Sequence, residues 1–160
     1  MPQQSKTKIL VADDDPDIRQ LMETCLGLEG YDVRVAEDGY DAICQITCEW
    51  RTPHPFDAAL LDAAMPLCDG FTVARVLKTL MAAAPRSPRI RIGFFTAHHE
   101  MVEESPLLER HGDPYWRKGD DVRQMVAEIR AWLRCEVEYA PDCDELRETA
   151  PEPGAAGGAG

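Results

Sequence analysis

Short apolar runs typical of buried strands alternate along this chain with longer segments whose apolar residues recur at helical spacing. The unit of a strand followed by a helix occurs five times between residues 7 and 135. Consecutive strands that are joined through helices lie parallel, and a parallel sheet needs helices on both faces. The sequence therefore predicts an α/β fold built on a single parallel sheet.

Helix-cap and turn residues predict where the strands and helices begin and end. We expect strands at residues 8–12, 32–36, 56–62, 90–96 and 115–117, and helices after Asp15-Pro16, after Asp38-Gly39, over 71–83 and over 121–133. Between the fourth and fifth strands we expect only a short helix, because Pro106 interrupts the segment; Ser105-Pro106 could cap it, with an end near His111. The result is a flavodoxin-like, doubly wound sheet with strand order 2-1-3-4-5 and five flanking helices.

Acidic residues follow the two strands that such a sheet places side by side. Asp13, Asp14 and Asp15 come after the first strand, and Asp62 ends the third. Carboxylates this close repel one another, and a divalent cation relieves that repulsion. Oxygen ligands favour Mg²⁺, which keeps several waters and readily takes a phosphate oxygen. The alternative to a metal site is a solvated acidic turn with a helix cap. It would explain Asp15 but not why Asp62 lies at the same edge of the sheet.

A hydroxyl and an ammonium are expected at that same edge. Thr96 ends the fourth strand and Lys118 follows the fifth. Taken singly, such a threonine is most often a strand-end residue and such a lysine a surface charge. Together, beside a metal-bound carboxylate, they are what a phosphoryl group on that carboxylate needs.

Five separated motifs thus stand in order over residues 7–135: Asp13-Asp14, Asp62-Ala63-Ala64-Met65-Pro66, Asp69-Gly70, Thr96-Ala97 and Lys118. In this order and spacing they resemble the receiver domain of two-component response regulators, of the single-domain chemotaxis type. The resemblance implies a phosphorylation-dependent signalling switch rather than a small-molecule enzyme. It also implies two kinds of partner: a sensor histidine kinase or phosphotransfer protein as donor, and an unknown downstream protein.

The resemblance assigns roles to individual residues. Asp62 would accept the phosphoryl group. Thr96 and Lys118 would contact its oxygens, and Tyr115 matches an aromatic residue that turns inward as Thr96 moves. The ligands of Mg²⁺ would be Asp13, Asp14, Asp62 and the backbone carbonyl of Ala64.

Two residues depart from the family pattern. Gly119 stands where a proline usually follows the lysine, so we expect a trans peptide, a looser loop and weaker coupling of phosphorylation to the partner-binding face. On that ground Gly119→Pro is expected to stabilise the phosphorylated form, provided that the loop accepts a cis peptide bond. Pro106 alters the fourth helix, which forms part of that face.

Charge bears on partners and location. The chain has 17 lysines and arginines against 29 aspartates and glutamates, a formal net charge of -12. We therefore expect no nucleic-acid partner, which would need a basic surface, and no membrane docking.

The flexible N-terminus, residues 1–6, lacks an apolar signal region, which predicts a cytoplasmic protein. Residues 7–135 form the expected receiver domain, and residues 136–160, acidic and rich in alanine, glycine and proline, predict a disordered tail.

Two other functions stay open on the sequence alone. A receiver-like adaptor that is never phosphorylated is favoured by Gly119 and Pro106, but not by the intact acidic set. A haloacid-dehalogenase-like phosphatase would use Asp13, Asp15, Thr96, Lys118 and the pair Asp120-Asp121. That scheme leaves Asp62 without a role and has no room for a cap domain, and turnover of small phosphate esters would distinguish it.

Overall fold

The predicted strands form one parallel sheet in the computed structural model, which describes residues 5–84, 86, 88–98, 100 and 113–135. The strand order is β2-β1-β3-β4-β5, which confirms the predicted doubly wound topology. The strands are β1 (Lys8–Ala12), β2 (Asp32–Ala36), β3 (Ala58–Leu61), β4 (Arg91–Thr96) and β5 (Tyr115–Arg117).

Every described helix begins directly after an aspartate. The carboxylates of Asp15, Asp38, Asp69 and Asp121 each accept a hydrogen bond from a backbone amide of the first turn, which satisfies a donor that the helix itself leaves free. The helices are α1 (Pro16–Leu28), α2 (Gly39–Glu49), α3 (Gly70–Ala83) and α6 (Val122–Arg134).

Three predictions fall outside the described residues. They are the short helix at 105–111, most of the N-terminal segment 1–6 and the acidic tail at 136–160. The division of the chain at residues 7 and 135 therefore stays a prediction.

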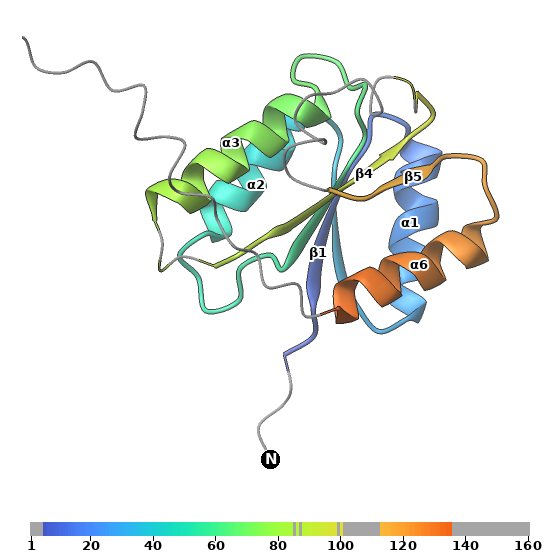
Figure 1. Ribbon diagram of the computed structural model, residues 1–160, viewed down its shortest axis with the longest axis horizontal. Coiled ribbons are helices and arrows are strands. Elements are labelled where there is room, and N and C mark those ends of the chain that lie inside the picture. The colour runs from blue at the N-terminus through green and yellow to red at the C-terminus, as the bar shows by residue number, and fades with distance from the viewer. Residues whose placement is uncertain (1–4, 85, 87, 99, 101–112, 136–160) are drawn as a thin grey trace, which may run out of the picture.

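The helices cover the sheet in two layers, α2 and α3 on one face and α1 and α6 on the other (Figure 1). Because side chains alternate along a strand, β1 contributes Leu10 and Ala12 to the core under α2 and α3, and Ile9 and Val11 to the core under α1 and α6. With both faces covered, all five residues of β1 are buried. In the described ranges, no helix is long and apolar enough to cross a membrane.

Candidate functional site

Strand register brings the two predicted acidic positions together. Ala12 of β1 pairs with Leu61 of β3, so Asp13 and Asp62 leave the sheet side by side. The Asp62 amide donates a hydrogen bond to the Ala12 carbonyl over 2.9 Å, which continues the ladder beyond the last strand residue. The backbone therefore fixes both carboxylates at the carboxyl edge of the sheet, where doubly wound folds place their sites.

Three carboxylates form one cluster at this edge. Oxygens of Asp13, Asp14 and Asp62 all lie within 4.8 Å of one another. Asp13 and Asp62 are buried, whereas Asp14 is exposed, so the cluster opens to solvent on one side. Burial is the largest influence on Asp13 and raises the pKa of its carboxyl, against the opposing effects of the Lys118 ammonium and of the hydrogen bond from the Asp15 amide.

Lys118 supplies the positive charge of the cluster. Its Nζ lies 2.6 Å from Asp13 Oδ2 and 2.8 Å from Asp62 Oδ2. Burial lowers the pKa of Lys118, but the two carboxylates outweigh burial and raise it overall. One ammonium among three carboxylates leaves the site with an excess of negative charge.

The cluster fits a divalent cation. Asp13 Oδ2 is buried and has no hydrogen bond of good geometry, since Lys118 approaches it as an ion pair only. A buried oxygen without a hydrogen bond is costly, and coordination to a cation would satisfy it. Carboxylate oxygens with open solvent access suit Mg²⁺, which retains waters.

Asp62 is held from both sides. Its Oδ1 accepts a hydrogen bond from the Ala64 amide over 3.2 Å, while Oδ2 contacts Lys118. The loop after β3 returns to pack on Asp62, because a Cβ on Gly70 would stand 2.2 Å from the Asp62 carbonyl oxygen. The carbonyl of Ala64, expected as a metal ligand, belongs to this loop, and its role stays a prediction.

Thr96 ends β4, whereas Tyr115 begins the neighbouring strand β5 opposite Phe94, and the two residues differ in exposure. Thr96 is fully buried, and its Oγ1 accepts a hydrogen bond from the His98 amide over 3.0 Å. The Lys118 amide donates to the Thr96 carbonyl over 3.0 Å, which ties the ammonium-bearing residue to β4. Tyr115 is 40% exposed, so its side chain is only partly buried in this structure.

The structure changes the expectation for Gly119. The Lys118–Gly119 peptide is trans, as predicted, but Gly119 has a φ of +100°. Proline is confined to a φ near -65° and cannot occupy this turn without rebuilding it. We therefore expect Gly119→Pro to lower the melting temperature and to slow phosphoryl uptake. Thermal unfolding and labelling by acetyl phosphate would check this, and faster uptake than in the wild type would contradict it.

Arg19 helps to position the acidic cluster, and its role was not predicted from the sequence. From α1, its Nη1 donates a hydrogen bond to the Asp13 carbonyl over 2.7 Å, which braces the turn between β1 and α1. The signal in the sequence is its position, because a basic residue near the start of a helix is unfavourable for the helix dipole and indicates a specific partner.

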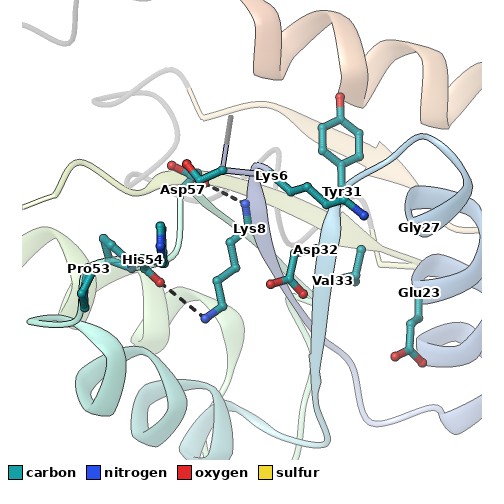
Figure 2. A pocket seen from close by; sticks show the side chains of 12 residues that line it. Lys6, Lys8, Glu23, Gly27, Tyr31, Asp32, Val33, Pro53, His54 and Asp57 are labelled. Atoms are coloured by element: carbon teal, nitrogen blue, oxygen red, sulfur yellow. Dashed lines mark hydrogen bonds between the residues drawn. The ribbon is translucent and has the colours of Figure 1, made fainter. Parts of the chain in front are cut away.

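A separate hollow of about 1010 Å³ lies at the opposite edge of the sheet, among the starts of β1 and β2 (Figure 2). Lys8 crosses it and forms an ion pair with Glu49, with its ammonium 4.9 Å from the centre of the Phe56 ring. The Lys8 amide donates to Asp57 over 2.7 Å. Lys8 is thus paired on both its amide and its ammonium, and the hollow lies away from the acidic cluster.

The comparisons agree on one family. Residues 9–147 match the family model described as "Response regulator receiver domain". The response regulator protein TrrA of Thermotoga maritima, solved in complex with Mg²⁺ and BeF, is 26% identical with a TM-score of 0.61, covering 79% of this chain and 98% of that one. The BeF3-activated receiver domain of Klebsiella pneumoniae RstA is 27% identical with a TM-score of 0.62, covering 80% and 99%.

Curated relatives include longer regulators. RpaA of Synechocystis sp., a "DNA-binding dual master transcriptional regulator", is 34% identical over 79% of this chain and 49% of its own length. Response regulator MprA of Mycobacterium avium is 33% identical over 79% and 51%. The chain thus spans about half the length of the curated relatives that it matches.

These relatives correct one expectation. The exclusion of a nucleic-acid partner from net charge is wrong, because a relative that matches this chain is named as DNA-binding. Charge summed over a receiver region describes only that region, whereas DNA binding in a longer protein can reside in another part of the chain.

A family model that matches most of the chain, relatives above 30% identity and the buried carboxylate cluster all lead to one assignment. The chain belongs to the response regulator receiver domain family, the phosphoacceptor switches of two-component signalling.

Proposed function

We propose that Asp62 is the residue that takes up the phosphoryl group, from a phosphohistidine on a sensor kinase or phosphotransfer protein. The observation that carries this proposal is the placement of Asp62 within reach of both Lys118 and the buried carboxylate of Asp13. An Asp62 carboxylate oxygen forms the new P–O bond, the P–N bond to the donor histidine breaks, and the imidazole leaves with the bonding electron pair. The product is an acyl phosphate on Asp62.

The other residues of the site serve that transfer. Asp13, Asp14, Asp62 and the Ala64 carbonyl would hold Mg²⁺, which when bound supplies positive charge against the carboxylate and phosphoryl oxygens. Lys118, already 2.8 Å from Asp62 Oδ2, would move onto a phosphoryl oxygen. The Thr96 hydroxyl would donate to another, in place of accepting from the His98 amide.

The new charge of roughly -1.5 to -2 would then bias a two-state surface. The inward movement of Thr96 would free space for Tyr115, whose ring is now partly in solvent. The relatives named as transcriptional regulators support a response that reaches DNA. The reaction is one phosphoryl transfer per cycle rather than turnover of a small molecule, and the free thiols of the five described cysteines suit a cytoplasmic setting.

The test is phosphoryl uptake from acetyl phosphate, measured as intact mass. We expect the wild type with Mg²⁺ to gain the mass of one phosphoryl group and to gain none in EDTA. Asp62→Asn should gain none in either condition, because an amide is a poor nucleophile and forms no stable acyl phosphate. Asp32→Asn is the matched control, since Asp32 lies at the opposite end of the sheet, and it should label as the wild type does. Labelling of Asp62→Asn, or labelling in EDTA at the wild-type rate, would refute the proposal.

A further inference from the structure

Two exposed cysteines share one face of helix α2. Cys44 and Cys48 lie four residues apart, so they stand one turn apart on the helix surface with Cβ atoms about 5–6 Å from each other. Both are exposed, whereas Ala42 and Ile46 of the same helix are buried. The two thiols therefore face solvent together, on the side of α2 opposite the part that covers the sheet (Figure 1).

Folding does not explain the presence of these two residues. Cysteine is among the residues most often buried, and it is a weaker helix former than alanine. Both thiols are free, and neither forms a hydrogen bond or an ion pair with another described residue. Cys68 differs, because it is partly buried and its thiol contacts the Asp69 carbonyl. The pair on α2 thus consists of two accessible thiols with no partner among the described residues.

The number of available ligands limits which metal the pair can hold. Among the described residues, the only group of three or more His, Cys, Asp or Glu side chains close enough to share an ion is the cluster of Asp13, Asp14 and Asp62. Zn²⁺ is held by about four ligands, so two thiols alone do not make a closed zinc site. Soft thiolates favour Cu(I), which is satisfied by two of them in a linear S–Cu–S arrangement.

The spacing and the exposure of the thiols suit such a linear site. Metal–thiolate bonds are about 2.3 Å long, so two sulfurs on opposite sides of one ion lie about 4.6 Å apart. Side chains one helical turn apart reach that separation without a change in the helix. One Cu⁺ with two thiolates carries a net charge of -1, and contact with water spares this complex the cost of burying a charge.

We propose that Cys44 and Cys48 form a two-thiolate site for one Cu(I) ion, which arrives by ligand exchange from a complex with a small thiol such as glutathione. Each cysteine forms a Cu–S bond as a Cu–S bond to a carrier thiolate breaks. The proton that the cysteine loses is taken up by the carrier thiolate that leaves, so the step needs no oxidant or reductant. The site is separate from the acidic cluster, since α2 continues from Cys48 to Glu49, which pairs with Lys8 at the opposite edge of the sheet.

The test is anaerobic titration with Cu(I) in the presence of bathocuproine disulfonate, which competes for copper held by single thiols. The wild type should take one ion from the competitor, whereas Cys44→Ser, Cys48→Ser and the double variant should take none. Cys135→Ser is the matched control, because Cys135 is also exposed and free but lies after α6, and it should bind as the wild type does. Uptake of the ion by the double variant would overturn the proposal.

Two further measurements examine the geometry of the site. Copper K-edge absorption should show two sulfur neighbours and no nitrogen or oxygen neighbour. The copper-loaded protein should elute from a sizing column at the same volume as the copper-free protein. A third ligand, or a dimer in which each chain supplies one thiolate, would overturn a site within a single helix.

Stability separates a role in metal binding from a role in folding. Because the ion would join two turns of α2, Cu(I) should raise the melting temperature of the wild type and of Cys135→Ser, but not that of Cys44→Ser. Cys44→Ala and Cys48→Ala should melt no lower than the wild type without copper, since alanine is the better helix former, and should also fail to hold Cu(I). An alanine variant that binds the ion, or that melts lower without copper, would contradict the proposal.

Discussion

Replacing Lys118 with methionine is expected to cost the metal-free protein about 3 kcal/mol of unfolding free energy, a large part of the stability of an ordinary domain. The ammonium lies 2.6 Å from Asp13 and 2.8 Å from Asp62, with only 12% of its side chain exposed. Its removal leaves two buried carboxylates facing each other without a counter-charge. The destabilisation should be visible as a lower denaturant midpoint in EDTA.

Magnesium should reverse much of this loss. In Lys118→Met the cation would be the only positive charge in the cluster, so its binding should raise the melting temperature more than in the wild type. Lys78→Met is the control, because Lys78 has a similarly buried ion pair, with Asp113. That variant should lose stability in both EDTA and Mg²⁺ equally. Equal magnesium shifts in Lys118→Met and in the wild type would contradict a cation site at these carboxylates.

A methyl group at Gly70 is the second large perturbation. The new Cβ of Gly70→Ala would stand 2.2 Å from the Asp62 carbonyl oxygen and 2.9 Å from its carbon, both of them backbone atoms that cannot rotate away. Overpacking of this kind costs about 3 kcal/mol. Relief requires a shift of the Asp62 backbone, so we expect phosphoryl uptake from acetyl phosphate to fall together with stability.

Two other glycines serve as controls for Gly70→Ala. The new Cβ of Gly39→Ala would stand 2.1 Å from the Cys68 carbonyl oxygen, so this variant should lose a similar amount of stability. Because Gly39 does not touch Asp62, Gly39→Ala should keep more of the phosphoryl uptake from acetyl phosphate, measured at a temperature where it is folded. Gly27→Ala has no atom within 4 Å of its Cβ and lies inside α1, so it should gain roughly 0.5–1 kcal/mol. Equal uptake in Gly70→Ala and Gly39→Ala, measured where both are folded, would refute the link between Gly70 and the acceptor.

The parts of the fold that follow from local chemistry could be predicted. β1 and β2 have their predicted bounds, because apolar runs end there at aspartates or turns. The starts of the helices could also be predicted from the local sequence, since aspartate at the N-cap is a short-range signal. β3 begins later than predicted, at Ala58, where the side chain of Asp57 accepts the Lys8 amide in place of a strand partner.

The parts that depend on long-range packing could not be predicted. Leu21 falls at helical spacing with the buried Met22 and Leu26, yet it is 37% exposed because it lies at the margin of the apolar stripe of α1. Nothing in the local sequence marks Leu67 for a positive φ, since the turn that imposes it is set by the packing of the loop on Asp62 and Gly39. The candidate site was predictable because strand order alone gathers its residues, whereas the bracing contact of Arg19 needed coordinates.

The packing of β5 on α6 has an optical consequence. Trp116 lies one residue after Tyr115 and two before Lys118, with its ring against Gly93 of β4, and it meets Trp132 of α6 edge to face at 5.4 Å between ring centres. Two indoles this close couple as an exciton pair, and the sign and strength of their near-ultraviolet circular dichroism depend on their mutual angle. Movement of β5 relative to α6 would therefore be recorded by chromophores that the chain already contains, without an attached label.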